Sequence, residues 1–154
     1  MRRSGFTLIE MVVVLAITAI GLSMAGVAFT SYFERVSAER AAQVFAQDLT
    51  LARDWALRSR EPVVIRFYET NLWYEVEAQT SSTEVARRRF GVNADIDLTG
   101  VALDMTGDSV VFDTRGIADL SGAGGPLGTA TFSSGAVSYT VSFNSMGASK
   151  IDRI

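Results

Sequence analysis

The sequence of 154 residues contains no cysteine and no histidine. The absence of cysteine excludes disulfide bonds, thiolate nucleophiles and cysteine-based metal sites. The absence of histidine removes the commonest general base and the commonest metal ligand, so the serines have no imidazole to activate them. An enzyme held at a membrane is therefore the least favoured of the functions that the composition leaves open.

Charge is missing from one long stretch. No charged residue occurs between Met11 and Phe33. An apolar run of at least ~18 residues predicts a transmembrane helix, and at ~1.5 Å per residue this run exceeds a ~30 Å bilayer core. From Glu34 onward the composition is that of an ordinary soluble domain. The sequence thus predicts a membrane segment over residues 6–33 and a separate head over residues 34–154.

Basic residues are not in excess. Fourteen lysines and arginines stand against 17 acidic residues, which gives a net charge of −3. This balance argues against a broadly basic nucleic-acid-binding domain and leaves only a local basic patch as a possibility.

The apolar run begins with an acid, Glu10, and two arginines, Arg2 and Arg3, precede it. A carboxylate at the mouth of a membrane helix is costly and therefore suggests a function. A secretory signal peptide with a cleavage site near residues 23–25 is one alternative, but the run exceeds the usual ~7–15 apolar residues. A plain anchor with a cytoplasmic N-terminus fits the arginines by the positive-inside rule, yet it leaves Glu10 unexplained.

The order of these residues resembles a known signal. Arg2-Arg3-Ser4-Gly5, then Phe6-Thr7-Leu8-Ile9-Glu10 and a long apolar helix, is similar to the class III signal of type IV pilins and type II secretion pseudopilins. The resemblance implies that a prepilin peptidase removes residues 1–5 by cutting between Gly5 and Phe6, and then methylates the Phe6 amine. It also implies a single-pass inner-membrane protein with a cytoplasmic N-terminus and a periplasmic head.

Within that resemblance Glu10 acquires a role in assembly. Cleavage creates an ammonium group at Phe6, which Glu10 of a neighbouring subunit would neutralise in a filament of packed helices. A buried carboxylate without a partner is strongly penalised, so such a pair would set the register between subunits.

The helix is predicted to continue beyond the apolar run to about Arg58, within residues 34–60. Apolar residues recur there at steps of three and four, which is the pattern of one buried helical face. They are Ala38, Ala42, Phe45, Leu49, Ala52 and Ala56. We expect the polar residues, Asp48 among them, to lie mostly on other faces, and Pro62 to end the helix.

Residues 62–154 are predicted to be rich in β-strands. Alternating or short apolar runs indicate six to eight strands. They lie at 63–68, 73–78, 96–98, 101–103, 109–112, 129–132 and 136–143, and a last short segment follows near 150–154. We expect exposed or mobile loops at 79–84 and at the glycine-rich segment 121–128, which lacks a phosphate-binding pattern. The fold class is α+β, with an antiparallel sheet packed on the second half of a long N-terminal helix, as in pilins.

Three further segments resemble the GspH/FimT group of minor pseudopilins and minor pilins. They are Leu49–Ala56 followed by Pro62–Ile65, Val111–Gly116, and Val141–Gly147. The resemblance implies a structural subunit whose partners are the prepilin peptidase, other pilin-like subunits and the inner membrane. It implies no cofactor and no metal, and Asp95-Ile96-Asp97 lacks the spacing of a calcium loop.

Basic residues in the head offer one alternative function. Arg87, Arg88, Arg89, Lys150 and Arg153 are candidates for contacts with DNA phosphates, because some FimT-type minor pilins are implicated in DNA uptake. Those members share a Gly-Arg-x-Arg motif that residues 147–153 lack. A solvated strand edge, where charge discourages pairing, is the favoured interpretation. The sequence therefore predicts a minor pseudopilin or minor pilin, of a type II secretion system or a type IV pilus.

Overall fold

A computed structural model of the chain describes residues 7–91 and 94–154, apart from the side chains of residues 24–28. The chain divides into two units, with the boundary between Phe33 and Glu34. Helix α1, Leu8–Ser59, supplies residues to both units, and its ends agree with those predicted from the sequence. In the described part of the chain, no helix combines the length and the apolar character needed to cross a membrane.

The second half of α1 carries the buried face that the sequence predicted. Seven apolar side chains on this face are fully buried: Ala38, Ala41, Ala42, Phe45, Leu49, Ala52 and Ala56. The alanines allow strands to approach the helix closely, and Phe45 and Leu49 fill the space between them. The prediction for Asp48 was wrong, because only 2% of this residue is exposed and it lies among the buried residues.

The helix ends through local backbone geometry. Ser59 Oγ donates a hydrogen bond to the Trp55 carbonyl oxygen at 2.8 Å, and Arg60 adopts a left-handed conformation with φ of 56°. A left-handed residue just after the last turn is a common helix stop, and Pro62 prevents the helix from resuming.

Within residues 7–91 and 94–154, nine strands form two antiparallel sheets rather than the single sheet of six to eight strands that we predicted. The first sheet has the order β3-β2-β1-β5-β6, with strands Thr83–Arg89, Trp73–Ala78, Val63–Tyr68, Ser109–Phe112 and Ala118–Asp119. The second has the order β4-β7-β8-β9, with strands Gly100–Leu103, Gly128–Ser134, Val137–Phe143 and Ser149–Arg153. A short 3-10 helix, η1, Glu69–Asn71, connects β1 to β2.

Strands β1 and β2, which form a hairpin, have the predicted bounds, whereas two neighbouring predictions fail. Residues 96–98 form no strand. Ile96 and Leu98 are nevertheless buried, because an irregular segment places their side chains in the core. The loop expected at 79–84 ends early, since β3 begins at Thr83. Strand β6 has two residues and carries too little pattern to be predicted.

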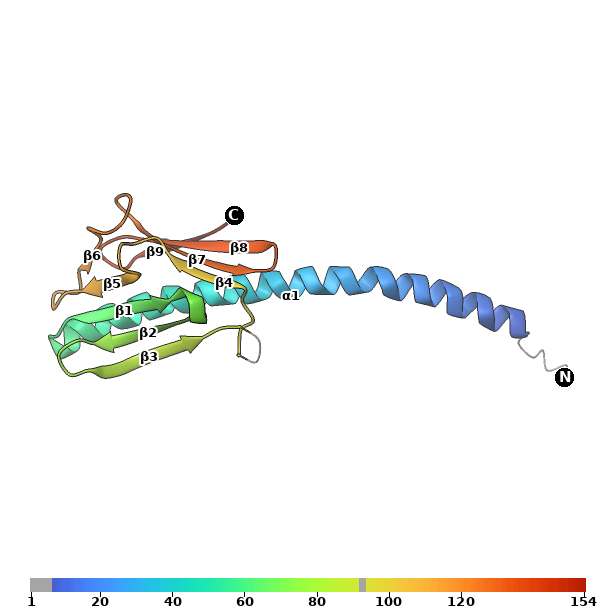
Figure 1. Ribbon diagram of the computed structural model, residues 1–154, viewed down its shortest axis with the longest axis horizontal. Coiled ribbons are helices and arrows are strands. Elements are labelled where there is room, and N and C mark those ends of the chain that lie inside the picture. The colour runs from blue at the N-terminus through green and yellow to red at the C-terminus, as the bar shows by residue number, and fades with distance from the viewer. Residues whose placement is uncertain (1–6, 92–93) are drawn as a thin grey trace. The chain divides into compact units, whose positions relative to one another are not determined.

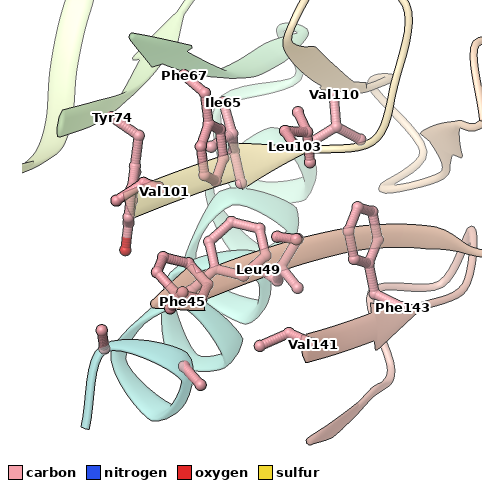
Figure 2. Close-up of a cluster of buried hydrophobic side chains, with 14 of the residues drawn as sticks. Phe45, Leu49, Ile65, Phe67, Tyr74, Val101, Leu103, Val110, Val141 and Phe143 are labelled. Atoms are coloured by element: carbon pink, nitrogen blue, oxygen red, sulfur yellow. The ribbon is translucent and has the colours of Figure 1, made fainter. Parts of the chain in front are cut away.

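A cluster of aromatic rings joins the two sheets to the helix. The Phe45 ring of α1 lies 5.3 Å from Phe67 and 5.5 Å from Tyr74 of the first sheet. It also lies 5.5 Å from Phe132 and 6.0 Å from Phe143 of the second sheet. Figure 2 shows Phe45 and Leu49 on the helix beneath side chains that come from both sheets. The core of the head is therefore centred on this part of α1.

Candidate functional sites at the helix start and at the arginine strand

The first candidate site is the start of α1. Gly5 and Phe6, the predicted cleavage and methylation site, lie outside the described residues. Thr7 Oγ1 accepts a hydrogen bond from the Glu10 backbone N–H at 3.3 Å, so Thr7 caps the helix. A threonine followed three residues later by glutamate is the pattern of a capping box. This cap was not among the features predicted from the sequence, although the Thr-x-x-Glu spacing indicates it.

The Glu10 side chain is exposed in the first turn of α1. Its carboxylate takes part in no ion pair with any residue that the structure describes. The negative charge is favourable near the positive end of the helix dipole. The side chain is thus free to contact another molecule, because the cap uses the backbone of Glu10 rather than its carboxylate.

The residues that follow Glu10 expose a large apolar surface. Leu8 is 83% exposed, and most of the large apolar side chains up to Phe33 are exposed as well. They include Ile9, Met11, Leu15, Ile17, Ile20, Leu22, Phe29 and Tyr32. Exposed apolar surface of this extent marks a site of interaction with lipid or with other proteins.

The second candidate site is strand β3, which holds Arg87, Arg88 and Arg89. Successive side chains of a strand point to opposite faces, so Arg88 points away from its two neighbours. Arg88 points toward α1, where its guanidinium contacts both carboxylate oxygens of Asp48 at 2.8 and 2.9 Å. The Tyr74 hydroxyl also donates to Asp48 at 2.8 Å.

This buried group is structural. The hydrogen bond to Asp48 raises the pKa of the Arg88 guanidinium, which keeps it charged. Burial, together with the negative charge of Asp48, raises the pKa of the Tyr74 hydroxyl well above its usual value, so Tyr74 stays neutral and can donate. Arg88 is therefore paired with an acid inside the head.

Asp48 is the residue whose burial was not predicted from the sequence. It stands at spacings of three and four from Phe45 and Ala52, which are both buried on the same helical face. A carboxylate at such a position is a signal of a buried ion pair, because a lone buried charge is not tolerated.

Arg87 lies on the outer face of the first sheet and is also paired. It contacts Glu75 at 3.3 Å and Glu84 at 2.6 Å, and it covers the Trp73 ring at 5.1 Å. Arg89 is exposed and forms no ion pair within the part of the chain that the structure describes.

Lys150 and Arg153 lie on β9, in the other sheet. Figure 1 shows β3 at the lower edge of the head and β9 at its upper edge. Lys150 is paired with Asp152 at 2.7 Å. The structure thus does not bring the five basic candidates together, and most of them are balanced by nearby acids.

Among the residues that the structure describes, Asp95 and Asp97 included, no three acidic side chains converge on one point. Asp113 and Asp119 have other partners: their carboxylates accept backbone hydrogen bonds, from Ile117 and Arg115 and from Ser121 respectively. These bonds lower the pKa of each carboxyl group and shape the turns around β6.

A long helix with one half covered by two antiparallel sheets, and with an exposed apolar stretch behind a capped acidic turn, defines a pilin-like subunit. The sequence profile of type II transport protein GspH matches residues 41–147, and that of the prokaryotic N-terminal methylation motif matches residues 1–26. The chain belongs to the GspH family, since the first match covers more than half of its length. No curated protein matches the sequence.

Two solved structures share the fold. The type IV minor pilin FimU of Pseudomonas aeruginosa is 13% identical with a TM-score of 0.56, over 79% of this chain and 92% of FimU. The minor pseudopilin EpsH of Vibrio cholerae is 14% identical with a TM-score of 0.51, over 76% of this chain and 97% of EpsH. The family and the fold together confirm the prediction of a minor pseudopilin or minor pilin. None of these descriptions refers to DNA.

Proposed function

We propose that the chain is made as a precursor and that a prepilin peptidase cuts it between Gly5 and Phe6. The same enzyme then methylates the new Phe6 amine. The match of residues 1–26 to the N-terminal methylation motif supports this proposal. Removal of residues 1–5 takes away Arg2 and Arg3, so 12 basic residues remain against 17 acidic ones and the side-chain balance becomes −5.

Residues 6–33 then act as the inner-membrane anchor before assembly and as the filament-core helix after it. The N-terminus lies in the cytoplasm, and the head, residues 34–154, lies in the periplasm. The uncharged run from Met11 to Phe33 and the exposure of its described large apolar side chains support this placement. Membership of the family implies assembly with other pilin-like subunits. The resulting filament is a type II secretion pseudopilus or a type IV pilus.

The observation that carries the proposal is the exposed Glu10 carboxylate at the head of the apolar surface. Thr7 caps the backbone of this turn, so the start of the helix does not need the charge of Glu10. A charge kept beside a surface that must be buried needs a partner. The Phe6 ammonium of a neighbouring subunit would supply it and fix the offset between the two helices.

Substitution Glu10→Gln tests this role, because it removes the charge and preserves size. Membrane insertion and cleavage after Gly5 are expected to persist, whereas incorporation into filaments falls at least about tenfold, equivalent to ~1.4 kcal/mol. Incorporation is measured by immunoblotting of sheared filaments against the membrane fraction, and the mature N-terminus by mass spectrometry.

Thr7→Ala is the matched control. It removes the cap, which costs about 1 kcal/mol of helix stability, but leaves the Glu10 charge in place. Incorporation of this variant should remain near the wild-type level. Normal incorporation of Glu10→Gln, or a mature protein that does not start at methylated Phe6, would refute the proposal.

A further inference from the structure

Strand β3 forms an outer edge of the first sheet, and its pairing shows which backbone groups are unused. The Phe90 N–H donates to the Leu72 carbonyl oxygen at 2.8 Å, so these residues form a hydrogen-bonded pair. Bonded and non-bonded pairs alternate along an antiparallel ladder, and Arg88 is therefore the next bonded residue. It follows that the N–H and C=O groups of Arg87 and Arg89 point to the open side of β3.

The hydrogen bonds between β2 and β1 lead to the same assignment of bonded and unbonded residues. The Gln79 N–H donates to the Pro62 carbonyl oxygen at 2.8 Å, so these two residues form a hydrogen-bonded pair. Bonded pairs recur at every second residue of the ladder, and Trp73 and Glu75 are therefore hydrogen-bonded to β1. These two residues of β2 are the partners of Arg89 and Arg87. The backbone N–H and C=O groups of Trp73 and Glu75 bond to β1. The N–H and C=O groups of Arg87 and Arg89 therefore have no partner within the sheet.

The open side of β3 is also hollowed and positively charged. A depression of about 360 Å³ is lined by Arg87, Arg89, Ala94 and Asp95. A smaller one of about 180 Å³ lies between the end of β3 and α1, where Arg40 joins the arginines of β3. Two adjoining hollows thus follow the end of the strand.

The charge of these hollows is only partly balanced. Arg87 and Arg88 have acidic partners within the head, whereas Arg40 and Arg89 form no ion pair among residues 7–91 and 94–154. Asp95 is the acid that faces them. The chain as a whole has a net charge of −3, but this concave surface holds guanidinium groups that have no acidic partner. Such a surface favours a carboxylate-rich partner, because a planar guanidinium group can donate two parallel hydrogen bonds to a carboxylate.

A second copy of β3, paired around Arg87 and Arg89, is disfavoured at this edge. Pairing of two β3 strands would place arginines beside arginines, and like charges across a strand pair are destabilising. The same arginines would attract an extended segment that carries alternate acidic side chains. Edge strands that add a peptide obtain affinity from backbone hydrogen bonds and selectivity from side chains.

We propose that β3 is a docking edge at which an extended acidic segment of a different protein adds as a further strand, bonded to the backbone of Arg87 and Arg89. Its alternate carboxylates lie on the face of the sheet that bears the Arg89 side chain, and they contact Arg89. This interface lies on the head and does not depend on processing or on Glu10, so its failure would leave the proposed function intact.

The direct test uses the full-length chain in detergent micelles and a short peptide of alternating glutamate and valine. Binding is measured by titration, and amide hydrogen exchange is measured by NMR. We expect the peptide to slow exchange of the Arg87 and Arg89 amides, while the Arg88 amide, which is already in the ladder, stays unchanged. The same peptide methylated at every amide nitrogen should not bind, because it keeps its charge but cannot donate hydrogen bonds.

Variants separate this edge from general charge effects. Arg89→Glu should weaken peptide binding at least about tenfold, since it reverses the charge beside the docked strand. Arg153→Glu is the control, because it makes the same change on β9 in the other sheet, and it should alter binding less than about twofold.

Four outcomes of the peptide experiments would overturn the proposal. They are the absence of peptide binding, equal binding of the methylated peptide, binding without protection of Arg87 and Arg89, and equal loss in the two variants. Binding of a DNA duplex in place of the peptide, lost in Arg89→Glu, would overturn it in favour of a nucleic-acid site.

Discussion

Asp48, Arg88 and Tyr74 form the most buried polar group of the head. The carboxylate of Asp48 is 2% exposed, and it accepts two hydrogen bonds from Arg88 and one from Tyr74. Such a group constrains structure in two ways: it ties β2 and β3 to α1, and it requires every partner to be present. Removal of one partner leaves a buried charge that water cannot solvate.

Substitution Arg88→Met should therefore destabilise the head. Loss of one partner of a fully buried pair costs ~3–5 kcal/mol, and because the Arg88 side chain is 43% exposed we expect about 2 kcal/mol. The measurement is the free energy of unfolding from urea denaturation of the full chain in micelles.

The neighbouring Arg87→Met is the matched control. The Arg87 side chain is 38% exposed, close to the value for Arg88, but Glu84 is exposed and the buried Glu75 keeps Arg66 and Tyr68 as partners. Its loss should cost no more than about 1 kcal/mol. Equal effects of the two substitutions would show that burial of Asp48 does not decide the cost.

At the scale of the element, strand β7 requires a residue without a side chain at its first position. Gly128 begins this strand and faces Phe143 of β8, a fully buried ring of the core. A Cβ atom at residue 128 would overlap this ring. Glycine is therefore needed here for space, whereas the sequence suggested only a glycine-rich loop that ends at this residue.

Gly128→Ala should lower the free energy of unfolding by about 1–3 kcal/mol, the usual cost of overpacking a core. Gly125→Ala is the control, because no atom lies within 4 Å of the position that its added methyl group would take, and its effect should stay within ~0.5 kcal/mol. Thermal or urea unfolding gives both values. An unchanged stability of Gly128→Ala would mean that Phe143 moves aside without loss.

At the scale of the whole molecule, the head has a core of its own. Its buried apolar residues all belong to residues 38–143, and they include the helical face from Ala38 to Ala56. The second half of α1 is therefore as much a part of the head as the sheets are, and Phe45 contacts rings from both sheets. A boundary placed before Ala38 should preserve this core, and one placed after Phe45 should not.

A fragment of residues 34–154 is expected to unfold cooperatively, with coincident circular dichroism and fluorescence transitions. A fragment of residues 46–154 loses Phe45 and three buried alanines. Removal of one buried phenylalanine alone costs ~3–5 kcal/mol, so the shorter fragment should not fold. Cooperative unfolding of the shorter fragment, or its absence in the longer one, would contradict this account of the core.

The sequence by itself determined the features that depend on local order. The spacing of apolar residues identified the buried face of α1, because helical periodicity depends only on the order of residues along the chain. These residues include Ala38, Phe45, Leu49 and Ala56. Alternation from Val63 to Ala78 located the first hairpin with its bounds for the same reason. The family followed from short motifs, and the profile matches confirmed it.

Only the tertiary structure decided which distant residues meet. Asp48 and Arg88 are 40 residues apart, and no local pattern states that a helical acid will face a strand arginine. The division into two sheets and the opposite-facing arginines of β3 depend on register and on long-range packing around Phe45. Backbone hydrogen bonding then left Arg87 and Arg89 with free groups on an open edge, because strand pairing is a property of neighbours in space.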